Sequence, residues 1–263
     1  MIPLRDQAVL RERFNAELRH PVKIDLFTQR EVSIFLPGRA ECQYCKPARE
    51  MLQELASLND NLSLRVHWAD DGPVEASKYS VERIPAVILR GRAAAHLKLY
   101  GFPGGTEFPA FIETIVDVSR GTSLLSEESR KKLARIKAAV GIQVFVTPAC
   151  PHCPAMARLA FNASLENANV KAEVVEISEF PELAQRYQVR AVPLTVIAGG
   201  GTKNQRTIAG AIPEQAFVDS ILAAAGLDTI EVEQPSGATT ALESAEVTGR
   251  AAEKRSGSGL ILP

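Results

Sequence analysis

The amino-acid sequence predicts an α/β fold made of two tandem units, each a central mixed β-sheet flanked by helices. Three observations lead to this prediction. The four cysteines fall into two Cys-x-x-Cys pairs, and their first members, Cys42 and Cys150, lie 108 positions apart. A motif Tyr-x-Val-x-x-(Ile/Val)-Pro recurs with the same offset and ends at Pro85 and Pro193. Apolar residues also recur in both halves with the spacing of alternating strands and helices.

A third repeated block has a slightly different offset. Ala110–Val116 resembles Ala216–Leu222, which is shifted by 106 positions instead of 108. A small length change therefore lies between the proline motif and this block. Because the blocks keep the same order in both halves, we expect one domain over residues 1–120 and a second over residues 121–229.

The second half is predicted to form a βαβ segment followed by a ββα segment. The prediction rests on buried apolar runs, a glycine-centred hairpin and a final amphipathic stretch. The expected elements are strand Ile142–Val146, a helix from the Cys pair to about Glu166, strand Val170–Ile177, helix Pro181–Tyr187, strands Leu194–Ile197 and Arg206–Ile208, and helix Pro213–Ala225.

The first half repeats this order with additions. Its expected elements are helix Gln7–Arg19, strands Val22–Phe27 and Val32–Leu36, a helix from the Cys pair to about Leu58, strand Leu62–Ala69, a hairpin around Gly91 and helix Glu107–Val118. Strand Val22–Phe27 has no expected counterpart in the second half. A bridging helix near Glu128–Ala139 joins the halves. Residues 230–263 have no aromatic residue and are rich in small and polar residues, which predicts a disordered tail.

Composition and charge argue against several classes of protein. The 263 residues are 46% hydrophobic and 23% charged, with a formal net charge of -1 and no strongly basic half. Nucleic-acid-binding proteins normally present a basic face, so no nucleic-acid partner is expected. The chain has no run of 18 apolar residues and no signal-like N-terminus, so we expect no membrane span and a cytoplasmic location.

Two cysteines separated by two residues can close a small disulfide ring. On a strand-to-helix turn, the first cysteine lies at the helix N-terminus and the second one turn inside. Backbone N–H groups and the helix dipole stabilise a thiolate there, and the thiolate is the attacking species in thiol–disulfide exchange. Cys42 and Cys150 are therefore the predicted nucleophiles, and Cys45 and Cys153 are the predicted buried resolving thiols.

Each pair is followed by a proline 43 positions after its first cysteine, and a β-branched residue precedes that proline. We expect Ile84–Pro85 and Val192–Pro193 to be cis peptides beside the redox turns, because cis bonds are essentially limited to X–Pro and the spacing matches in both halves. Their backbone would pair with an extended client peptide by β-addition. The ordinary alternative is a trans proline at the start of an edge strand.

The residues between the cysteines differ in the two pairs. Gln43 and Tyr44 separate the first pair, whereas Pro151 and His152 separate the second. Pro151 suits the first turn of a helix, and a protonated His152 favours the Cys150 thiolate. Since a stabilised thiolate makes the disulfide a better oxidant, the second site is predicted to be the more oxidising. The alternative for His152 is a solvent-exposed spacer.

Zinc binding is the main alternative for the cysteines, but 104 residues lie between Cys45 and Cys150, and each pair has its own repeat. No metal and no cofactor is therefore expected. Glu176 and Asp70 lie near the ends of corresponding strands, where a carboxylate can accept the proton of a buried cysteine; a surface position is an equal alternative. Trp68, the only tryptophan, is either a redox reporter or a core residue.

These motifs resemble a known family, the protein disulfide oxidoreductases of thermophiles, which are glutaredoxin-like tandem proteins. The resemblance covers about Gln7 to Leu227. The segments that carry it are Cys42-Gln43-Tyr44-Cys45, Tyr100-Gly101-Phe102-Pro103, Ile115-Val116-Asp117-Val118-Ser119-Arg120 and Val144-Phe145-Val146-Thr147-Pro148-Ala149-Cys150-Pro151-His152-Cys153-Pro154.

The resemblance implies two tandem thioredoxin-fold units that reduce, form or isomerise disulfides in intracellular proteins. It also implies a thioredoxin-reductase-like flavoenzyme as the partner that recharges them. The chain departs from the family pattern at three places. His152 stands where the family usually has Tyr, Val22–Gln29 is an extra segment, and a long tail follows Leu227.

Three other functions remain open. A thioredoxin-fold scaffold would bind peptides without turnover, which four intact cysteines do not favour. The electron-transfer module of a peroxide-reducing system has a similar tandem fold but usually keeps one working cysteine pair. A glutathione-dependent glutaredoxin role is also open, although no glutathione-binding constellation is evident around Thr195.

Overall fold

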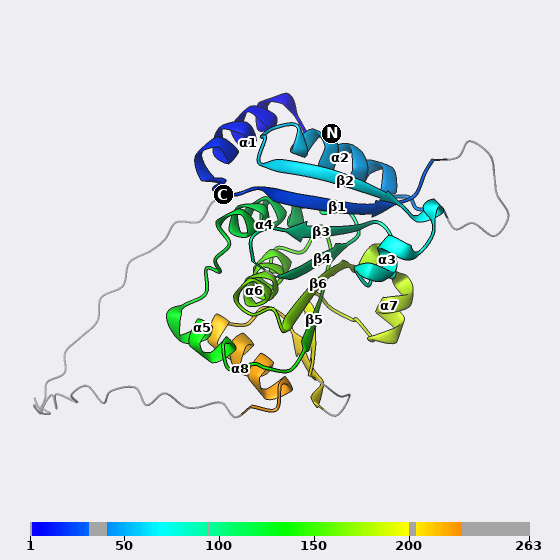
Figure 1. Cartoon of the computed structure of the whole chain (residues 1–263). Coiled ribbons are helices and arrows are strands. Elements are labelled where there is room, and N and C mark those ends of the chain that lie inside the picture. Colours follow the sequence, from blue (N-terminus) through cyan, green and yellow to red (C-terminus); the bar gives the residue numbers. More distant parts are fainter. Residues whose placement is uncertain (1, 32–40, 94, 200–203, 228–263) are drawn as a thin grey trace, which may run out of the picture. The chain divides into compact units, whose positions relative to one another are not determined.

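The computed structural model describes residues 2–31, 41–93, 95–199 and 204–227. We call the elements up to α4 the N-terminal half and those from α5 onward the C-terminal half (Figure 1). The N-terminal half contains α1 (Leu4–Glu17), β1 (Val22–Thr28), α2 (Cys45–Ala56), β2 (Leu62–Trp68), η1 (Ala69–Asp71), α3 (Val74–Lys78), β3 (Ala86–Arg90), β4 (His96–Tyr100) and α4 (Glu107–Arg120). The C-terminal half contains α5 (Glu127–Leu133), β5 (Val140–Val146), α6 (Cys153–Glu166), β6 (Val170–Glu176), η2 (Ile177–Glu179), α7 (Pro181–Arg186), β7 (Leu194–Ala198), β8 (Arg206–Ala209) and α8 (Glu214–Ala224).

The eight strands in the described part of the chain form one sheet, with the order β2-β1-β3-β4-β6-β5-β7-β8. The first four strands come from the N-terminal half and the last four from the C-terminal half. Each half has the same internal pairing, in which its first strand lies parallel to the second and antiparallel to the third. The halves meet where β4 pairs with β6 in parallel, from His96–Lys171 to Tyr100–Val175. The predicted mixed α/β repeat is therefore present, and the two halves share a continuous sheet.

The strand directions place both cysteine turns at one end of this sheet. Successive pairings make β1, β4, β6 and β5 all run in the same direction. The carboxyl ends of β1 and β5 therefore lie at the same end of the sheet. From these ends the chain runs toward Cys42 and Cys150. Four strand-to-strand steps separate β1 from β5 in the sheet, which is roughly 19 Å at about 4.8 Å per step.

Strand β1 corrects one expectation from the sequence. Val22–Phe27 was expected to be an addition without a counterpart, yet β1 (Val22–Thr28) occupies in its half the place that β5 occupies in the other. Its inward side chains, such as Ile24 and Leu26, belong to the main core. The segment is therefore essential to the sheet, and the length difference between the halves lies after it. The strand expected at Val32–Leu36 and the tail at 230–263 lie outside the described residues.

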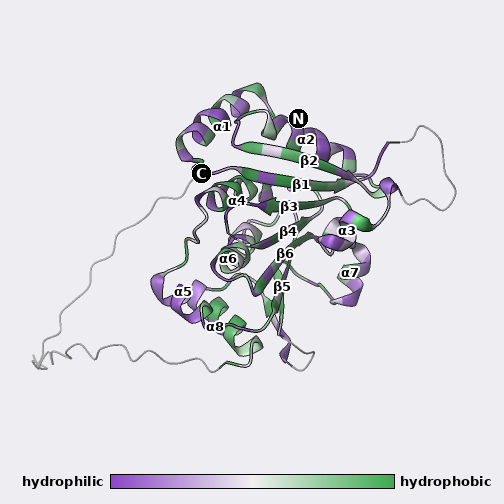
Figure 2. Cartoon of the chain, viewed as in Figure 1, coloured by the Kyte–Doolittle hydropathy of each residue, from purple (hydrophilic) through white to green (hydrophobic). Residues whose placement is uncertain are grey.

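Helices cover both faces of the sheet, and the inner strands β3 and β7 are apolar almost throughout. Core residues of α2, α4, α6 and α8 pack on one face, and residues of η2, α3 and α7 pack on the other. Consistent with burial on both sides, four of the five residues of β3 and of β7 are buried. Figure 2 shows hydrophobic residues along β3 and hydrophilic residues over much of α1 and α5.

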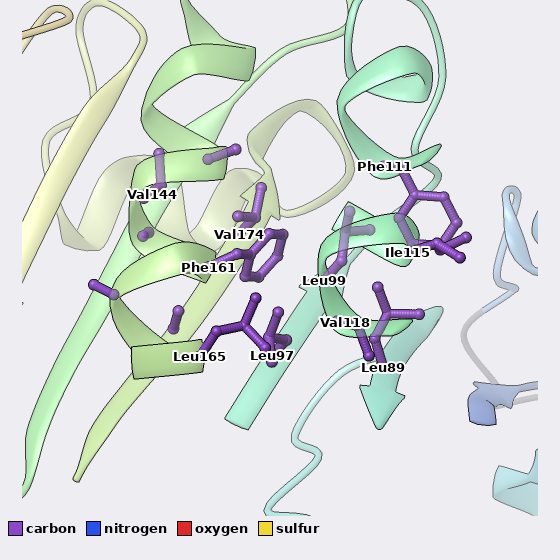
Figure 3. Packing of buried hydrophobic residues seen from close by; sticks show 14 of the residues in the cluster. Leu89, Leu97, Leu99, Phe111, Ile115, Val118, Val144, Phe161, Leu165 and Val174 are labelled. Atoms are coloured by element: carbon purple, nitrogen blue, oxygen red, sulfur yellow. The ribbon is translucent and has the colours of Figure 1, made fainter. Parts of the chain in front are cut away.

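The core continues across the junction of the two halves. In Figure 3, Phe161 and Leu165 of α6 lie over Leu97 of β4 and Val174 of β6. Helix α6 of the C-terminal half thus packs on a strand of the N-terminal half. Beside it, α4 places Phe111, Ile115 and Val118 over Leu99 and Leu89. Residues Met1–Thr229 form one compact unit as a result.

Local signals explain where several helices begin and end. The Ser126 side chain accepts the Ser129 N–H at the start of α5. Helix α4 ends at Gly121, whose φ of 71° is the left-handed conformation that favours glycine. Helix α3 was not predicted because five residues carry too little periodicity. None of the helices in the described ranges has the length and apolar character needed to cross a membrane.

Candidate active site

The N-terminal redox turn lies between β1 and α2. Cys42 and Cys45 form a disulfide, with their Cα atoms 5.4 Å apart. The Gln29 side-chain oxygen accepts the Cys42 N–H at 3.0 Å, and the Thr28 hydroxyl donates to the Cys45 carbonyl at 3.3 Å. Cys42 is partly exposed, whereas Cys45 is 2% exposed. The end of β1 therefore holds both cysteines of this turn.

The C-terminal redox turn lies between β5 and α6. Cys150 and Cys153 form the second disulfide, with their Cα atoms 5.5 Å apart. Cys150 is 7% exposed and Cys153 is fully buried. The Cys153 N–H donates to the Cys150 sulfur at 3.1 Å, whereas the Cys45 N–H donates to the Cys42 carbonyl at 3.4 Å. The backbone at the second site is thus placed to stabilise negative charge on Cys150 Sγ.

The repeated prolines lie beside these turns. Ile84–Pro85 and Val192–Pro193 are both cis peptides, as the sequence predicted. Pro85 immediately precedes β3, and the pairing of β3 with β1 brings it level with Thr28, which contacts Cys45. The carbonyl oxygens of both prolines accept the N–H groups of glycines that follow β4 and β8. Each redox turn therefore has a proline-containing strand start next to it.

The N-terminal half also contributes to the C-terminal turn. Thr106, which directly precedes α4, donates its hydroxyl to the Cys150 carbonyl at 2.9 Å and to the Pro148 carbonyl at 3.1 Å. Its backbone N–H donates to the same Pro148 oxygen at 2.9 Å. The second redox turn is thus contacted by a loop that belongs to the other repeat.

Three carboxylates lie behind this contact. Glu107 is the first residue of α4 and is 3% exposed; within the described ranges no hydrogen-bond partner reaches its Oε1. Burial, and then the neighbouring Glu176, raise the pKa of Glu107 to about 7. Burial raises the pKa of Glu179 to about 7 as well, against the opposing effect of the Phe102 N–H that it accepts at 2.6 Å. Carboxyl groups with such pKa values can exchange protons at neutral pH.

The structure adjusts two expectations about the helix starts. Helices α2 and α6 begin at the second cysteine of each pair, so Cys45 and Cys153 are first residues rather than residues one turn inside. Pro151 was expected in the first helical turn, but it lies in the preceding bend, and Pro154 occupies that turn. His152 is exposed and directly precedes α6.

The two carboxylates that were considered as proton acceptors for a buried cysteine lie in different surroundings: Glu176 is buried, and Asp70 is exposed. Glu176 is buried at the end of β6, where its Oε1 accepts the Ser178 N–H at 3.1 Å. Asp70 is exposed in η1 and accepts the Arg30 N–H at 2.9 Å, so it holds a surface loop.

Sequence reasoning missed Thr106, the adjacent Glu107 and Gln29, of which Thr106 and Gln29 contact the cysteine turns. A signal for the first two was present, because the repeat offset changes from 108 to 106 in the loop that carries them. Gln29 had no comparable signal. No cluster of three or more histidine, cysteine or acidic side chains in the described ranges is arranged to hold a metal ion.

Comparison with known proteins agrees with this geometry. The family model for the thioredoxin domain matches residues 140–223. The thioredoxin of Methanocaldococcus jannaschii is 35% identical over 83 residues, which are 31% of this chain and 92% of that protein. The family model falls on one of the two repeats, and a stretch of 83 residues covers nearly the whole of that small thioredoxin, so one repeat is comparable in size to it.

Solved structures match both repeats together. A protein disulfide oxidoreductase from Aeropyrum pernix aligns with a TM-score of 0.74 and 26% identity, over 88% of this chain and 97% of that one. An N-terminal domain of the alkylhydroperoxide reductase AhpF from Enterococcus faecalis aligns with a TM-score of 0.71 and 23% identity, over 84% of this chain and all of that one. The second match shows a shared fold.

The fold of this chain agrees with these relatives, and the chain has two Cys-x-x-Cys disulfides at its strand-to-helix turns. Each cysteine pair forms its own disulfide inside its own repeat. The chain belongs to the thioredoxin family and is a thiol–disulfide oxidoreductase with two redox sites.

Proposed function

We propose that the chain exchanges disulfides with client proteins at both sites, with Cys42 and Cys150 as nucleophiles and Cys45 and Cys153 as resolving thiols. The observation that carries this assignment is the same in both turns. The first cysteine of each pair is more exposed than the second, which is the first residue of a helix. A client sulfur can approach the first cysteine in line, while the second is screened from solution.

The exchange has two balanced steps. The Cys150 thiolate attacks one sulfur of a client disulfide, a mixed disulfide forms, and the other client sulfur leaves as a thiolate. Cys153 then loses its proton and attacks Cys150 Sγ, and the second client sulfur leaves. Two electrons have passed to the client, and the Cys150–Cys153 disulfide remains. The reverse sequence installs a disulfide in a dithiol client, and Cys42 with Cys45 acts in the same way.

Nearby groups support each step. The Cys153 N–H at 3.1 Å from Cys150 Sγ favours the attacking thiolate. Glu107 directly follows Thr106, which contacts the Cys150 carbonyl, and it has a pKa of about 7, so we propose it as the acceptor of the proton that Cys153 gives up. The backbone at Ile84 and at Val192, which precedes each proline, is the proposed pairing edge for an extended client segment.

The cycle needs a partner that returns electrons to the enzyme disulfides. We propose a thioredoxin-reductase-like flavoenzyme for this role and a cytoplasmic location for the cycle. A reducing compartment keeps the dithiol forms available and keeps client thiols in exchange.

The test is reduction of insulin disulfides by dithiothreitol in the presence of wild type, Cys42→Ser, Cys150→Ser and the double variant. Each single variant should retain part of the rate, and the double variant should fall to the rate of dithiothreitol alone. Circular dichroism controls for folding. A double variant as fast as wild type would contradict the assignment.

Further arms of the same assay separate the alternatives. If the chain were a peptide-binding scaffold, insulin would be reduced at the rate of dithiothreitol alone in the presence of wild type and of every variant. A glutathione-dependent enzyme would need glutathione in place of dithiothreitol as the electron source. An electron-transfer module dedicated to a peroxidase would accept electrons from a flavoenzyme but leave insulin intact.

A further inference from the structure

We propose that Thr106, a residue of the N-terminal half, is a positioning residue for the Cys150 turn and raises the reduction potential of the Cys150–Cys153 disulfide. The inference rests on the proposed function only in taking Cys150 as the attacking thiol. Three observations support it.

The first observation is that the loop between β4 and α4 is fastened to the C-terminal half at both ends. At its start, the Phe102 N–H donates to Glu179 Oε1 at 2.6 Å. At its end, the Thr106 N–H donates to the Pro148 carbonyl at 2.9 Å. Between them, Gly105 has a φ of 56°, and a Cβ there would lie 2.9 Å from Pro148 Cβ. The close approach of this loop to the Cys150 turn therefore depends on glycine.

The second observation is the bond that the Thr106 side chain makes. Its hydroxyl donates to the Cys150 carbonyl at 2.9 Å and to the Pro148 carbonyl at 3.1 Å. The Cys150 carbonyl belongs to the residue whose sulfur becomes the thiolate. A donor on that oxygen offsets its partial negative charge, which would otherwise oppose charge on the nearby sulfur. The hydroxyl therefore favours the reduced, thiolate-bearing form and makes the disulfide a stronger oxidant.

The third observation is that, within the described residues, only the N-terminal half supplies a contact like that of the Thr106 hydroxyl with the redox turn of the other half. Six residues separate β4 from α4, whereas four separate β8 from α8. With the 106-position offset of this block, the counterpart of Thr106 is Ile212, which has no hydroxyl, and its N–H donates to Met156 Sδ within the C-terminal half. The two added residues in the N-terminal half thus lie in the loop that reaches the C-terminal redox turn.

The two sites also differ in how the first cysteine is held. The Cys42 carbonyl accepts the N–H of Cys45, a donor from within its own turn. The Cys150 carbonyl accepts a side-chain donor from the other half instead. A change at Thr106 should therefore act on one disulfide and leave the other as an internal control.

The experiment uses the full chain as wild type, Thr106→Val, Thr106→Ala and Thr106→Ser. Each protein is equilibrated with mixtures of reduced and oxidised dithiothreitol, quenched with acid and alkylated with a maleimide. Mass spectrometry of the two cysteine peptides then gives the reduced fraction of each site separately. The reaction is balanced, because one dithiol becomes a cyclic disulfide as the enzyme disulfide becomes two thiols.

We expect Thr106→Val and Thr106→Ala to shift the Cys150–Cys153 equilibrium toward the disulfide by about threefold to tenfold, the effect of one hydrogen bond. That change corresponds to a potential more negative by about 14 to 30 mV. Thr106→Ser keeps the hydroxyl and should stay within about twofold of wild type. The Cys42–Cys45 equilibrium should be unchanged in all four proteins.

The proposal is wrong if Thr106→Val and Thr106→Ala leave the Cys150–Cys153 equilibrium within twofold of wild type, if both disulfide equilibria shift equally, or if Thr106→Ser behaves like Thr106→Val. These outcomes are independent of the proposed function. A wild-type chain that fails to reduce insulin still has two measurable disulfide equilibria, so the two failures are distinguishable.

Discussion

Glu107 and Glu214 begin the corresponding helices α4 and α8, yet their surroundings differ. Glu214 Oε1 accepts the Ser126 N–H at 2.9 Å, whereas no partner in the described ranges reaches Glu107 Oε1. Burial raises the pKa of Glu107 to about 7. For Glu214, burial also raises the pKa, but hydrogen bonds from the start of α5 outweigh it and the net shift is downward. The acidic residue that begins each helix is thus held by hydrogen bonds in the C-terminal half, whereas in the N-terminal half it is buried with a raised pKa.

This difference predicts opposite pH effects for Glu107→Gln and Glu214→Gln. Because the folded-state pKa of Glu107 is raised, its stabilising contribution is full below about pH 4.5 and is lost as pH rises through about 7. The free energy of unfolding of wild type should therefore fall between pH 5 and pH 8, by at most about 3 kcal/mol from this group. Glu107→Gln should remove that part of the slope and be the more stable protein at pH 8.

Glu214→Gln is the matched control. Its lowered pKa stabilises the fold above about pH 4.5, and that contribution is lost at lower pH. The variant should be less stable than wild type at pH 7 and should approach it in acid. Urea unfolding of the oxidised proteins from pH 4 to pH 8 measures both. If the free energy of unfolding changed with pH in the same way for Glu107→Gln and wild type, Glu107 would not bind its proton more tightly in the folded state.

A second prediction concerns the buried charges of the N-terminal half. Asp25 is fully buried on β1, where it accepts Arg90 Nε at 2.7 Å and pairs with His67 Nε2 at 2.8 Å. Arg90→Ala leaves this carboxylate without its guanidinium partner, and should lower the free energy of unfolding by about 2–4 kcal/mol. Arg92→Ala, two positions along at an exposed site, should change it by less than about 0.5 kcal/mol. Equal effects of the two substitutions would argue against a structural role for the Asp25 pair.

Trp68 provides a third prediction, as a reporter of one redox site. It pairs in register with Thr28, whose hydroxyl contacts the Cys45 carbonyl. A nearby disulfide quenches indole emission, so reduction with dithiothreitol should increase Trp68 fluorescence. Replacing Cys150 and Cys153 by serine should preserve the increase. Replacing Cys42 and Cys45 should abolish it, and an increase that survives there would place the sensed disulfide at the other turn.

The fourth prediction concerns His152, which is exposed immediately before α6. A positive charge there favours the Cys150 thiolate, so the second disulfide should be the more oxidising of the two. His152→Ala should shift the Cys150–Cys153 equilibrium with dithiothreitol toward the disulfide by about twofold to fivefold at pH 6, as expected for one exposed charge. The Cys42–Cys45 equilibrium is the control. Equal reduction potentials of the two disulfides in wild type, or an unchanged Cys150–Cys153 equilibrium in His152→Ala, would show that His152 does not set the potential of this site.

Much of the fold was predictable from the sequence because its signals are local. Alternating or continuous apolar runs identified β5, β6 and β7, and the repeated spacing of cysteine and proline identified the two turns. The cis bonds at Pro85 and Pro193 followed from the same repeat. Strand β1 was the main error: it was recognised as a strand, but its equivalence to β5 depends on its pairing partners, which are distant in sequence.

By itself, the sequence determined the chemistry of this protein: two Cys-x-x-Cys pairs, each with a proline at fixed spacing. These features are short-range patterns, and the exchange of sulfur bonds needs little else to be recognised. Only the tertiary structure decided that β4 and β6 join the halves into one sheet and that Thr106 reaches the second redox turn. Such contacts depend on packing between residues about 40 positions apart or more, and no local pattern of side chains encodes which loop will meet which turn.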